Sequence, residues 1–326
     1  GFRNMSYGSG KYTYELVEWA KLPPGLSFLD VGGISTDAKD NVCVLNRSQY
    51  PIMVFDREGN LLKKWGEGFF NRAHGSTITP EGHIWCTDDR NHIVAKFDAN
   101  GNLLMTLGTK GQASDSGYIR TWDFWESLGR VVRAAPPFNR PTGVALNSKG
   151  EIFIADGYGN ASMHKFSPNG KFILSWGAPG GKPGQFRLPH SCRVDKKDRV
   201  WVVDRENHRL QIFDGKGKFL DQWTDVSRPN GVVIDKDQIV YVSELTQRVS
   251  IFNIKGKLLA RWGSQGESQE TALFLAPHAL TVDSRGDIYV GEVAKTFAKI
   301  DRGARTVQKF IRKRKNQFDK PFQRLI

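Results

Sequence analysis

Short apolar runs alternate with turn residues along most of the chain, and one hairpin-shaped pattern recurs six times. Each copy has an apolar or aromatic pair, a turn built on Asp, Asn or Gly, a second apolar pair and, in most copies, a Trp. The copies cover residues 54–66, 96–108, 165–177, 212–223 and 251–263, with a degraded copy at 299–311. Alternation on both sides of a tight turn predicts a β-hairpin in every copy.

A second hairpin pattern lies upstream of each copy and completes a repeating unit. Its six copies span residues 32–46, 73–88, 141–156, 189–204, 229–244 and 277–292. Six units of four short strands, each about 40 to 48 residues long, predict an all-β, six-bladed β-propeller with four-stranded blades. We expect the propeller to cover residues 1–311 and a basic C-terminal tail to cover residues 312–326.

Closing the ring requires a strand that joins the last blade to the start of the chain. The segment 12–19 has the pattern of an outermost strand, and the segment 306–311 competes with it for the same place. The alternation of apolar and polar residues does not decide between them.

Residues 109–138 interrupt the repeat between the second and third units. Aromatic residues are frequent in this insertion, and the spacing of apolar residues over 122–133 predicts a short helix. Two interpretations stay open. The insertion is either a decoration on the rim or a lid over one end of the channel.

Histidines occupy one column of the predicted blades. The first strand of each blade lines the central channel, and the column of its opening residues reads Gly33, His74, Thr142, His190, Asn230 and His278. Alternate blades of a six-fold ring stand about 120° apart, so three imidazoles are expected to converge on the axis. Three imidazoles with an open fourth position form the ligand set of a catalytic zinc site. The other four histidines fall in turns or outer strands and are expected to be solvated: His83, His92, His164 and His208.

A second column lies at the same rim of the channel. The residues that follow the second strand of each blade are Arg47, Asp89, Gly157, Arg205, Leu245 and Val293, and Tyr158 comes directly after Gly157. Arg47 and Arg205 are expected to overhang the metal, where a guanidinium group can bind a carboxylate in a bidentate manner. Tyr158, close to a metal ion and to positive charges, is a candidate general base.

Composition and charge narrow the function classes. The chain has 326 residues, 39% hydrophobic and 25% charged, with a formal net charge of +13. No apolar run approaches the ~18 residues of a membrane span, so no membrane partner is expected. Part of the positive charge lies in the tail 312–326. The body shows no basic stripe interleaved with aromatics, which argues against a nucleic-acid partner.

Cysteine usage favours a reducing compartment. Cys43, Cys86 and Cys192 are an odd number of cysteines and lie far apart, which argues against a disulfide scaffold. The start of the sequence shows no apolar stretch of the signal-peptide kind. A cytoplasmic location is therefore expected.

The repeats resemble the NHL family of propellers, and units two to four resemble the peptidyl-α-hydroxyglycine α-amidating lyases. The most specific matches are DGYGN at 156–160 and PHS at 189–191 followed by DREN at 204–207, and the resemblance covers residues 32 to 292. It implies zinc bound by three histidines, a catalytic tyrosine and two active-site arginines. These positions correspond here to His74, His190, His278, Tyr158, Arg47 and Arg205.

The sequence departs from the lyase pattern at two sites near the last histidine. Ala276 replaces the family's methionine, so a different substrate pocket is expected. Ala279 stands where the family has an acidic residue, which argues against its structural calcium. The disulfide cysteines of the secreted enzymes are also absent.

The resemblance implies a zinc-dependent lyase, or one using another divalent transition metal, that breaks a C–N bond in a small α-hydroxy carboxylate. N-acyl-α-hydroxyglycine and ureidoglycolate-like compounds are the expected substrates, and Arg47, Arg205, Asn230 and Ala276 are the expected substrate contacts. Two alternatives stay open: a metal-dependent hydrolase, hydratase or lactonase using the same site, and a non-catalytic propeller that binds protein or RNA.

Overall fold

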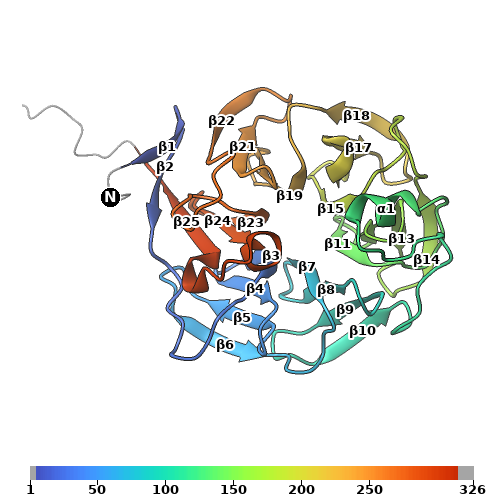
Figure 1. The fold of residues 1–326 in the computed structure, drawn as a ribbon, viewed down its shortest axis with the longest axis horizontal. Helices are drawn as coiled ribbons and strands as arrows, with labels where there is room; N and C mark the ends of the chain where they lie inside the picture. The colour runs from blue at the N-terminus through green and yellow to red at the C-terminus, as the bar shows by residue number, and fades with distance from the viewer. Residues whose placement is uncertain (1–4, 315–326) are drawn as a thin grey trace, which may run out of the picture.

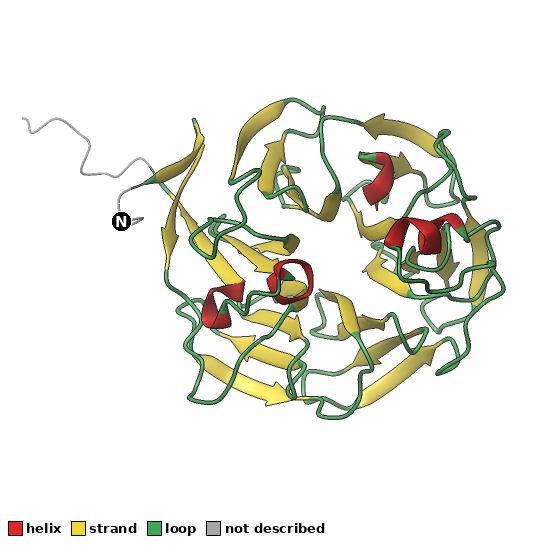
Figure 2. Ribbon diagram, viewed as in Figure 1, coloured by secondary structure: helices red, strands yellow, loops and turns green. Residues whose placement is uncertain are grey.

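Six antiparallel sheets stand around a central axis as the blades of a propeller (Figure 1). The computed structural model describes residues 5–314. Five sheets have four strands and the sixth has five, and helix is confined to short segments near the rim (Figure 2). The predicted all-β, six-bladed architecture is confirmed.

The first two strands of every blade lie nearest the axis and are buried along most of their length. These inner hairpins are β3 (Val31–Thr36) and β4 (Val42–Asn46), β7 (Ala73–Ile78) and β8 (Ile84–Asp88), β11 (Pro141–Leu146) and β12 (Ile152–Asp156), β15 (Pro189–Val194) and β16 (Val200–Asp204), β19 (Pro229–Ile234) and β20 (Val240–Glu244), and β23 (Pro277–Val282) and β24 (Ile288–Glu292). All six second strands are fully buried, because each is covered on both faces by a neighbouring blade.

The outer two strands of the first five blades carry the recurring hairpin. They are β5 (Ile52–Phe55) and β6 (Leu61–Trp65), β9 (Ile93–Phe97) and β10 (Leu103–Leu107), β13 (Ser162–Phe166) and β14 (Phe172–Trp176), β17 (Arg209–Phe213) and β18 (Phe219–Trp223), and β21 (Arg248–Phe252) and β22 (Leu258–Gly263). The last strand is largely exposed in the first four of these hairpins, as expected for a sheet edge that faces solvent, while β22 in the fifth is partly covered by β1 and β2.

Both candidate closing strands are used in the sixth blade. Its order is β1 (Ser6–Ser9), β2 (Tyr12–Val17), β25 (Val307–Arg312), β24 and β23, so the N-terminal strand lies outside the C-terminal one. Tyr14 of β2 is fully buried, and its ring lies 5.1 Å from the ring of Trp262 in the fifth blade. The two ends of the chain therefore close the ring together.

The expected hairpin at 299–311 does not form. Helix α2 (Ala294–Ala298) and a 3₁₀ turn (Gly303–Thr306) fill the space before β25, because the N-terminal strand supplies the partner that a hairpin would have provided. The blade also extends beyond residue 311, since β25 includes Arg312 and the Lys313 amide donates to the Thr13 carbonyl at 2.8 Å. The rest of the expected tail, 315–326, lies outside the described residues.

The insertion forms a loop that carries one short helix, α1 (Phe124–Gly129), above the third blade (Figure 1). Asp123 begins the helix, because its carboxylate accepts hydrogen bonds from the amides of Trp125 and Glu126. The helix is shorter than the segment 122–133 predicted for it. No helix in the described part of the chain has the length and apolarity needed to cross a bilayer.

Tryptophans at the ends of outer strands rest on glycines of the next blade. Trp176 faces Gly217, whose φ of +86° suits glycine and whose missing side chain leaves room for the indole. A methyl group at Gly217 would lie 2.7 Å from a ring carbon of Trp176. Trp65 and Trp223 face Gly101 and Gly256 in the same way, so the contact repeats around the ring.

Gly217→Ala is expected to lower the free energy of unfolding by about 1–3 kcal/mol more than Gly184→Ala does. Both positions have nearly the same positive φ, +86° and +83°, but nothing lies within 4 Å of a methyl group at Gly184. The difference between the two losses therefore measures the cost of the steric clash between the added methyl group and Trp176. Urea denaturation of both variants measures it, and equal losses would contradict the proposed contact.

Candidate active site

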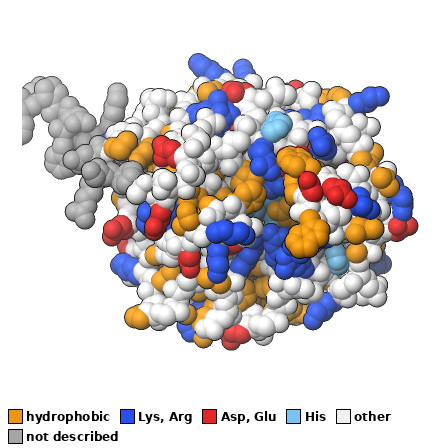
Figure 3. Space-filling model, viewed as in Figure 1, with side chains coloured by type: hydrophobic (Ala, Val, Ile, Leu, Met, Phe, Trp, Pro, Cys, Tyr) orange, Lys and Arg blue, Asp and Glu red, His pale blue; other side chains and the backbone are white. Residues whose placement is uncertain are grey.

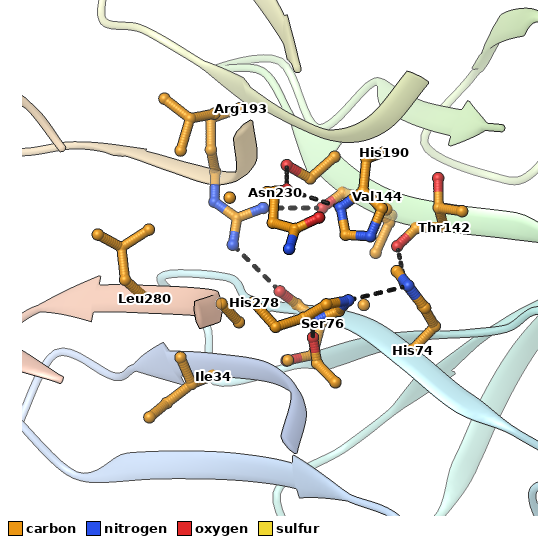
Figure 4. A pocket seen from close by; sticks show the side chains of 18 residues that line it. Ile34, His74, Ser76, Thr142, Val144, His190, Arg193, Asn230, His278 and Leu280 are labelled. Atoms are coloured by element: carbon orange, nitrogen blue, oxygen red, sulfur yellow. Dashed lines mark hydrogen bonds between the residues drawn. The ribbon is translucent and has the colours of Figure 1, made fainter. Parts of the chain in front are cut away.

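Three imidazoles meet on the propeller axis. His74, His190 and His278 are the second residues of β7, β15 and β23, and each is at most 3% exposed. Their ring centroids lie 4.7 Å apart in all three pairs, and one nitrogen from each lies within 4.8 Å of the others (Figure 4). Alternate blades thus deliver three nitrogen donors to one point.

The residue that occupies this column in the first blade is Gly32, and the expectation of Gly33 was wrong by one residue. The offset from the turn that gives Thr142, eight residues before Gly150, gives Gly32 before Asp40 in the first blade. The sequence pattern itself therefore assigns Gly32 to this column, in agreement with the structure. The same column holds Thr142 in the third blade and Asn230 in the fifth.

The intervening blades orient the imidazoles. The Nδ1 atoms of His74, His190 and His278 lie 2.6, 2.7 and 2.7 Å from the carbonyl oxygens of Thr142, Asn230 and Gly32. A carbonyl only accepts, so each Nδ1 must donate, and the Nε2 lone pair is left free to bind another group.

Burial keeps the three imidazoles neutral. It lowers the pKa of each well below the usual histidine range, and neighbouring imidazoles and arginines lower the pKa values further. The Nε2 atoms of His74 and His278 lie 3.2 Å apart. Two nitrogen lone pairs at this distance repel each other unless a cation lies between them. Tetrahedral zinc with bonds of about 2.0–2.1 Å holds ligand nitrogens roughly 3.3 Å apart, so the donor set fits such an ion.

Tyr158 reaches the histidines from the mouth of the channel. Its hydroxyl lies 2.9 Å from Nε2 of His74 and 3.3 Å from Nε2 of His190. The glycines on either side of Tyr158 explain this close approach. A side chain at Gly157 would collide with the Pro189 carbonyl, and one at Gly159 would collide with the Asn139 side chain.

Arg47 and Arg205 both lie at this rim. Arg47 donates to the Ala73 carbonyl at 3.1 Å and lies 3.6 Å from the Asp30 carboxylate, and its Nη2 is buried with no partner among residues 5–314. Burial, and then the nearby Arg72, lower the pKa of Arg47. Arg205 is 2% exposed, and its guanidinium lies 5.8 Å from the Tyr158 ring centroid.

Asn230 and Ala276, the other two expected substrate contacts, are fully buried, and neither they nor Arg47 line the pocket at the mouth. The Asn230 amide donates to the Pro277 carbonyl at 2.8 Å, and its oxygen accepts from Arg205 at 3.4 Å. Ala276 packs with Leu245 and Val293 in a small apolar cluster. Ala276 therefore supports the rim from behind, while Asn230 lines the small cavity among the three histidines.

Three rim arginines were missed by the sequence analysis: Arg72, Arg140 and Arg228. They lie two residues before the histidine column, on the second, third and fifth blades. Their carbonyls accept hydrogen bonds from the residues that follow the second strands, including Tyr158. Comparing the residues two positions before the histidine column in each repeat would have identified these arginines.

A pocket of about 560 Å³ lies between the insertion and the histidines. Its lining combines arginines of the rim with aromatic residues of the insertion, and basic and hydrophobic side chains surround the same hollow in Figure 3. Tyr158 and Arg205 are part of this lining, while a cavity of only about 30 Å³ lies among the histidines and Arg193 below them. Small molecules can therefore reach Tyr158 and Arg205 from the side of the insertion.

One expectation about the remaining histidines was wrong. His164 is fully buried, with Nε2 2.9 Å from the Asp156 carboxylate and Nδ1 2.6 Å from the Ser175 hydroxyl. His164 lies on β13, which the sequence pattern predicts to be an outer strand. Phe138 of the insertion covers it, with 5.4 Å between the two ring centroids. His92 and His208 each accept a hydrogen bond from the backbone amide of a rim arginine.

Comparisons with known proteins agree with the repeat pattern. A family model for the NHL repeat matches residues 138–166 and 186–213. NHL repeat-containing protein 3 of Mus musculus is 30% identical over 276 residues, which cover 80% of this chain and 72% of that protein. The chain belongs to the NHL-repeat family.

The NHL-repeat propeller is also related to amidating enzymes. Peptidyl-glycine alpha-amidating monooxygenase B of Xenopus laevis is 32% identical over 226 residues, covering 59% of this chain and 24% of that protein. A probable peptidyl-alpha-hydroxyglycine alpha-amidating lyase of Caenorhabditis elegans is 32% identical over 166 residues, covering 50% and 42%. The propeller thus matches about a quarter of the length of the Xenopus relative.

A solved structure of streptogramin B lyase shares the fold of the NHL-repeat propeller. Its TM-score is 0.59 at 13% sequence identity, and the match covers 93% of this chain and 99% of that one. At this identity the likeness shows the architecture alone.

Glu206→Gln is expected to lower the free energy of unfolding by about 3–5 kcal/mol. The buried Glu206 carboxylate accepts from Arg205 at 2.8 Å and from Arg228 at 2.9 Å, so its loss leaves buried positive charge uncompensated. The control Glu126→Gln removes an exposed pair with Arg130 and should cost at most about 0.5 kcal/mol. Chemical denaturation distinguishes the two, and a loss below about 1 kcal/mol for Glu206→Gln would contradict its role in the rim.

Proposed function

We propose that this protein is a metal-dependent lyase that cleaves the C–N bond of a small N-acyl-α-hydroxyglycine-like acid. The observation that carries the proposal is the set of three Nε2 lone pairs, oriented by Nδ1 hydrogen bonds, directly beneath a tyrosine hydroxyl. The relationship to amidating enzymes supports the same chemistry.

His74, His190 and His278 would hold the metal through Nε2, with zinc as the ion that best fits three imidazoles and an open position. The metal would supply Lewis acidity, which lowers the pKa of a substrate hydroxyl. The hydrogen bonds from Nδ1 to backbone carbonyls hold each ring in one tautomer and increase its basicity toward a metal.

Tyr158 would move the proton. Its hydroxyl oxygen stands at the mouth side of the histidines, where a substrate hydroxyl entering from the pocket would meet it. As the phenolate, it would accept the hydroxyl proton while the C–N bond breaks and a C=O bond forms. Returning that proton to the departing nitrogen yields a neutral amide and glyoxylate, which balances the reaction.

Arg47 and Arg205 would orient the substrate. Arg47 has a buried Nη2 with no partner among the described residues, and Arg205 lies against the Tyr158 ring. A carboxylate bound between them would place the adjacent carbon, which bears the hydroxyl and the nitrogen, over the histidines. The same positive charges would favour the build-up of negative charge on oxygen during cleavage.

The insertion would act as a lid on this chemistry. Phe124 and Trp125 of α1 and Tyr118 line the pocket that leads to Tyr158. Exclusion of water by these aromatic side chains strengthens every charge interaction below them.

Purified protein is expected to contain one transition-metal ion per chain and to release glyoxylate from N-benzoyl-α-hydroxyglycine. Chelation should abolish the release and zinc should restore it. His190→Ala should lose both metal and activity, because two imidazoles cannot replace three. The control His83→Ala alters a half-buried imidazole in the turn after β7, at the opposite end of the blade from the histidine trio, and should retain both. Elemental analysis and a glyoxylate assay measure these outcomes.

Metal-replete protein that releases no glyoxylate from α-hydroxyglycine or ureidoglycolate compounds would contradict the lyase chemistry. Protein that binds no transition metal at all would contradict the metal site itself.

Tyr158→Phe is expected to lower kcat by about 10²–10⁴-fold while metal content stays unchanged, since it removes only the proton-transfer group. Tyr118→Phe is the matched control. Its hydroxyl accepts from Arg140 at 2.9 Å at the outer end of the pocket, so kcat should change only a few-fold. Steady-state kinetics with parallel metal analysis separate the two roles, and equal effects of the two substitutions would argue against Tyr158 as the base.

A further inference from the structure

The mouth pocket carries far more positive charge than one carboxylate needs. Six arginines line it: Arg72, Arg90, Arg120, Arg140, Arg205 and Arg228. No Asp or Glu lines it within the described residues. Every charged side chain that lines the pocket is therefore positive.

Two buried carboxylates behind this wall neutralise only part of the charge. Asp89 lies 3.4 Å from Arg72 and 3.1 Å from Arg140, and both of its neighbours share its single charge. Glu206 is shared in the same way by Arg205 and Arg228. Two negative charges are thus shared among four guanidinium groups.

Arg90 and Arg120 have no acidic partner at all in the part of the chain that the structure describes. Arg72 and Arg120 both act on Arg90 with like charge, and Asp89, already paired with Arg72 and Arg140, opposes them in part. Burial and these like charges lower the pKa of Arg90. Such an arrangement is unfavourable in the free protein and becomes favourable when an anion binds.

Aromatic side chains of the insertion line the pocket beside Arg205 and Arg228. Phe124 lies against Arg205, with 5.5 Å between guanidinium and ring centroid, and Trp125 lies against Arg228 at 5.7 Å. Both rings are substantially exposed, 39% and 50%, although they face a hollow. They offer flat apolar surface to whatever part of a ligand crosses the pocket.

We propose that the pocket selects substrates that carry a second anionic group, joined through a flat apolar segment to the carboxylate held near the histidines. Arg90 and Arg120 bind the second group, and Phe124 and Trp125 pack on the segment between. The position of the first carboxylate rests on the proposed function. The preference for a second negative charge rests on the arginines of the pocket alone.

The test compares two unreactive ligands of matched shape, hippurate with one negative charge and 4-carboxyhippurate with two. Isothermal titration calorimetry at about 50 mM salt is expected to show at least tenfold tighter binding of 4-carboxyhippurate, with the advantage falling as salt rises. In Arg90→Gln/Arg120→Gln the advantage should shrink to less than threefold. Arg120→Gln alone, at an exposed position, should reduce it partly and guards against misfolding of the double variant.

The matched control is Arg130→Gln/Arg133→Gln. It removes the same charge, from the insertion that also carries Arg120, but these arginines pair with Glu126 and Asp115 and do not line the pocket. It should keep the full preference. Equal affinities for the two ligands in the wild-type protein, or an equal loss of preference in the control, would overturn the proposal.

The outcome is separable from the lyase hypothesis. A preference for 4-carboxyhippurate without glyoxylate release from N-(4-carboxybenzoyl)-α-hydroxyglycine would refute the lyase and support the pocket. Glyoxylate release at equal kcat/KM from the benzoyl and 4-carboxybenzoyl compounds would support the lyase and refute the pocket.

Discussion

The hydrogen bond from each axial imidazole to the carbonyl of the next blade is the contact on which the site depends. It joins His74 to Thr142, His190 to Asn230 and His278 to Gly32, so all six blades take part. Each bond fixes a ring orientation and a tautomer at once. Three neutral donors then face one point in a buried environment, an arrangement that suits a cation and would be repulsive without one.

The ring must close for this geometry to exist, because the three histidines are separated by about a hundred residues each and are held only by their blades. The last blade combines strands from both ends of the chain, β2 and β25, and the His278 strand belongs to that blade. Tryptophan–glycine contacts between successive blades, such as Trp176 on Gly217, repeat at the periphery and stabilise the packing of one blade on the next. The contacts that stabilise the outer part of the ring therefore also hold the three histidines in position at the axis.

The rim above the histidines is organised by shared buried carboxylates. Asp89 and Glu206 each hold two arginines, which fixes the guanidinium groups while leaving net positive charge toward the pocket. A carboxylate on a ligand can complete this network. The aromatic residues of the insertion cover the same place, so apolar contact and charge recognition occur in one pocket.

The sequence by itself determined the propeller, its six units and the alternating histidines, because repeats place equivalent residues at equivalent positions regardless of distant contacts. It also placed Tyr158, Arg47 and Arg205 at one rim. It failed where coverage by a distant segment matters, since Phe138 of the insertion covers and buries His164. The use of both terminal strands, the packing of Ala276 behind the rim, and the pairing of arginines with shared carboxylates were decided only by the tertiary structure. These features depend on which side chains from separate blades face each other, and short-range alternation carries no information about such contacts.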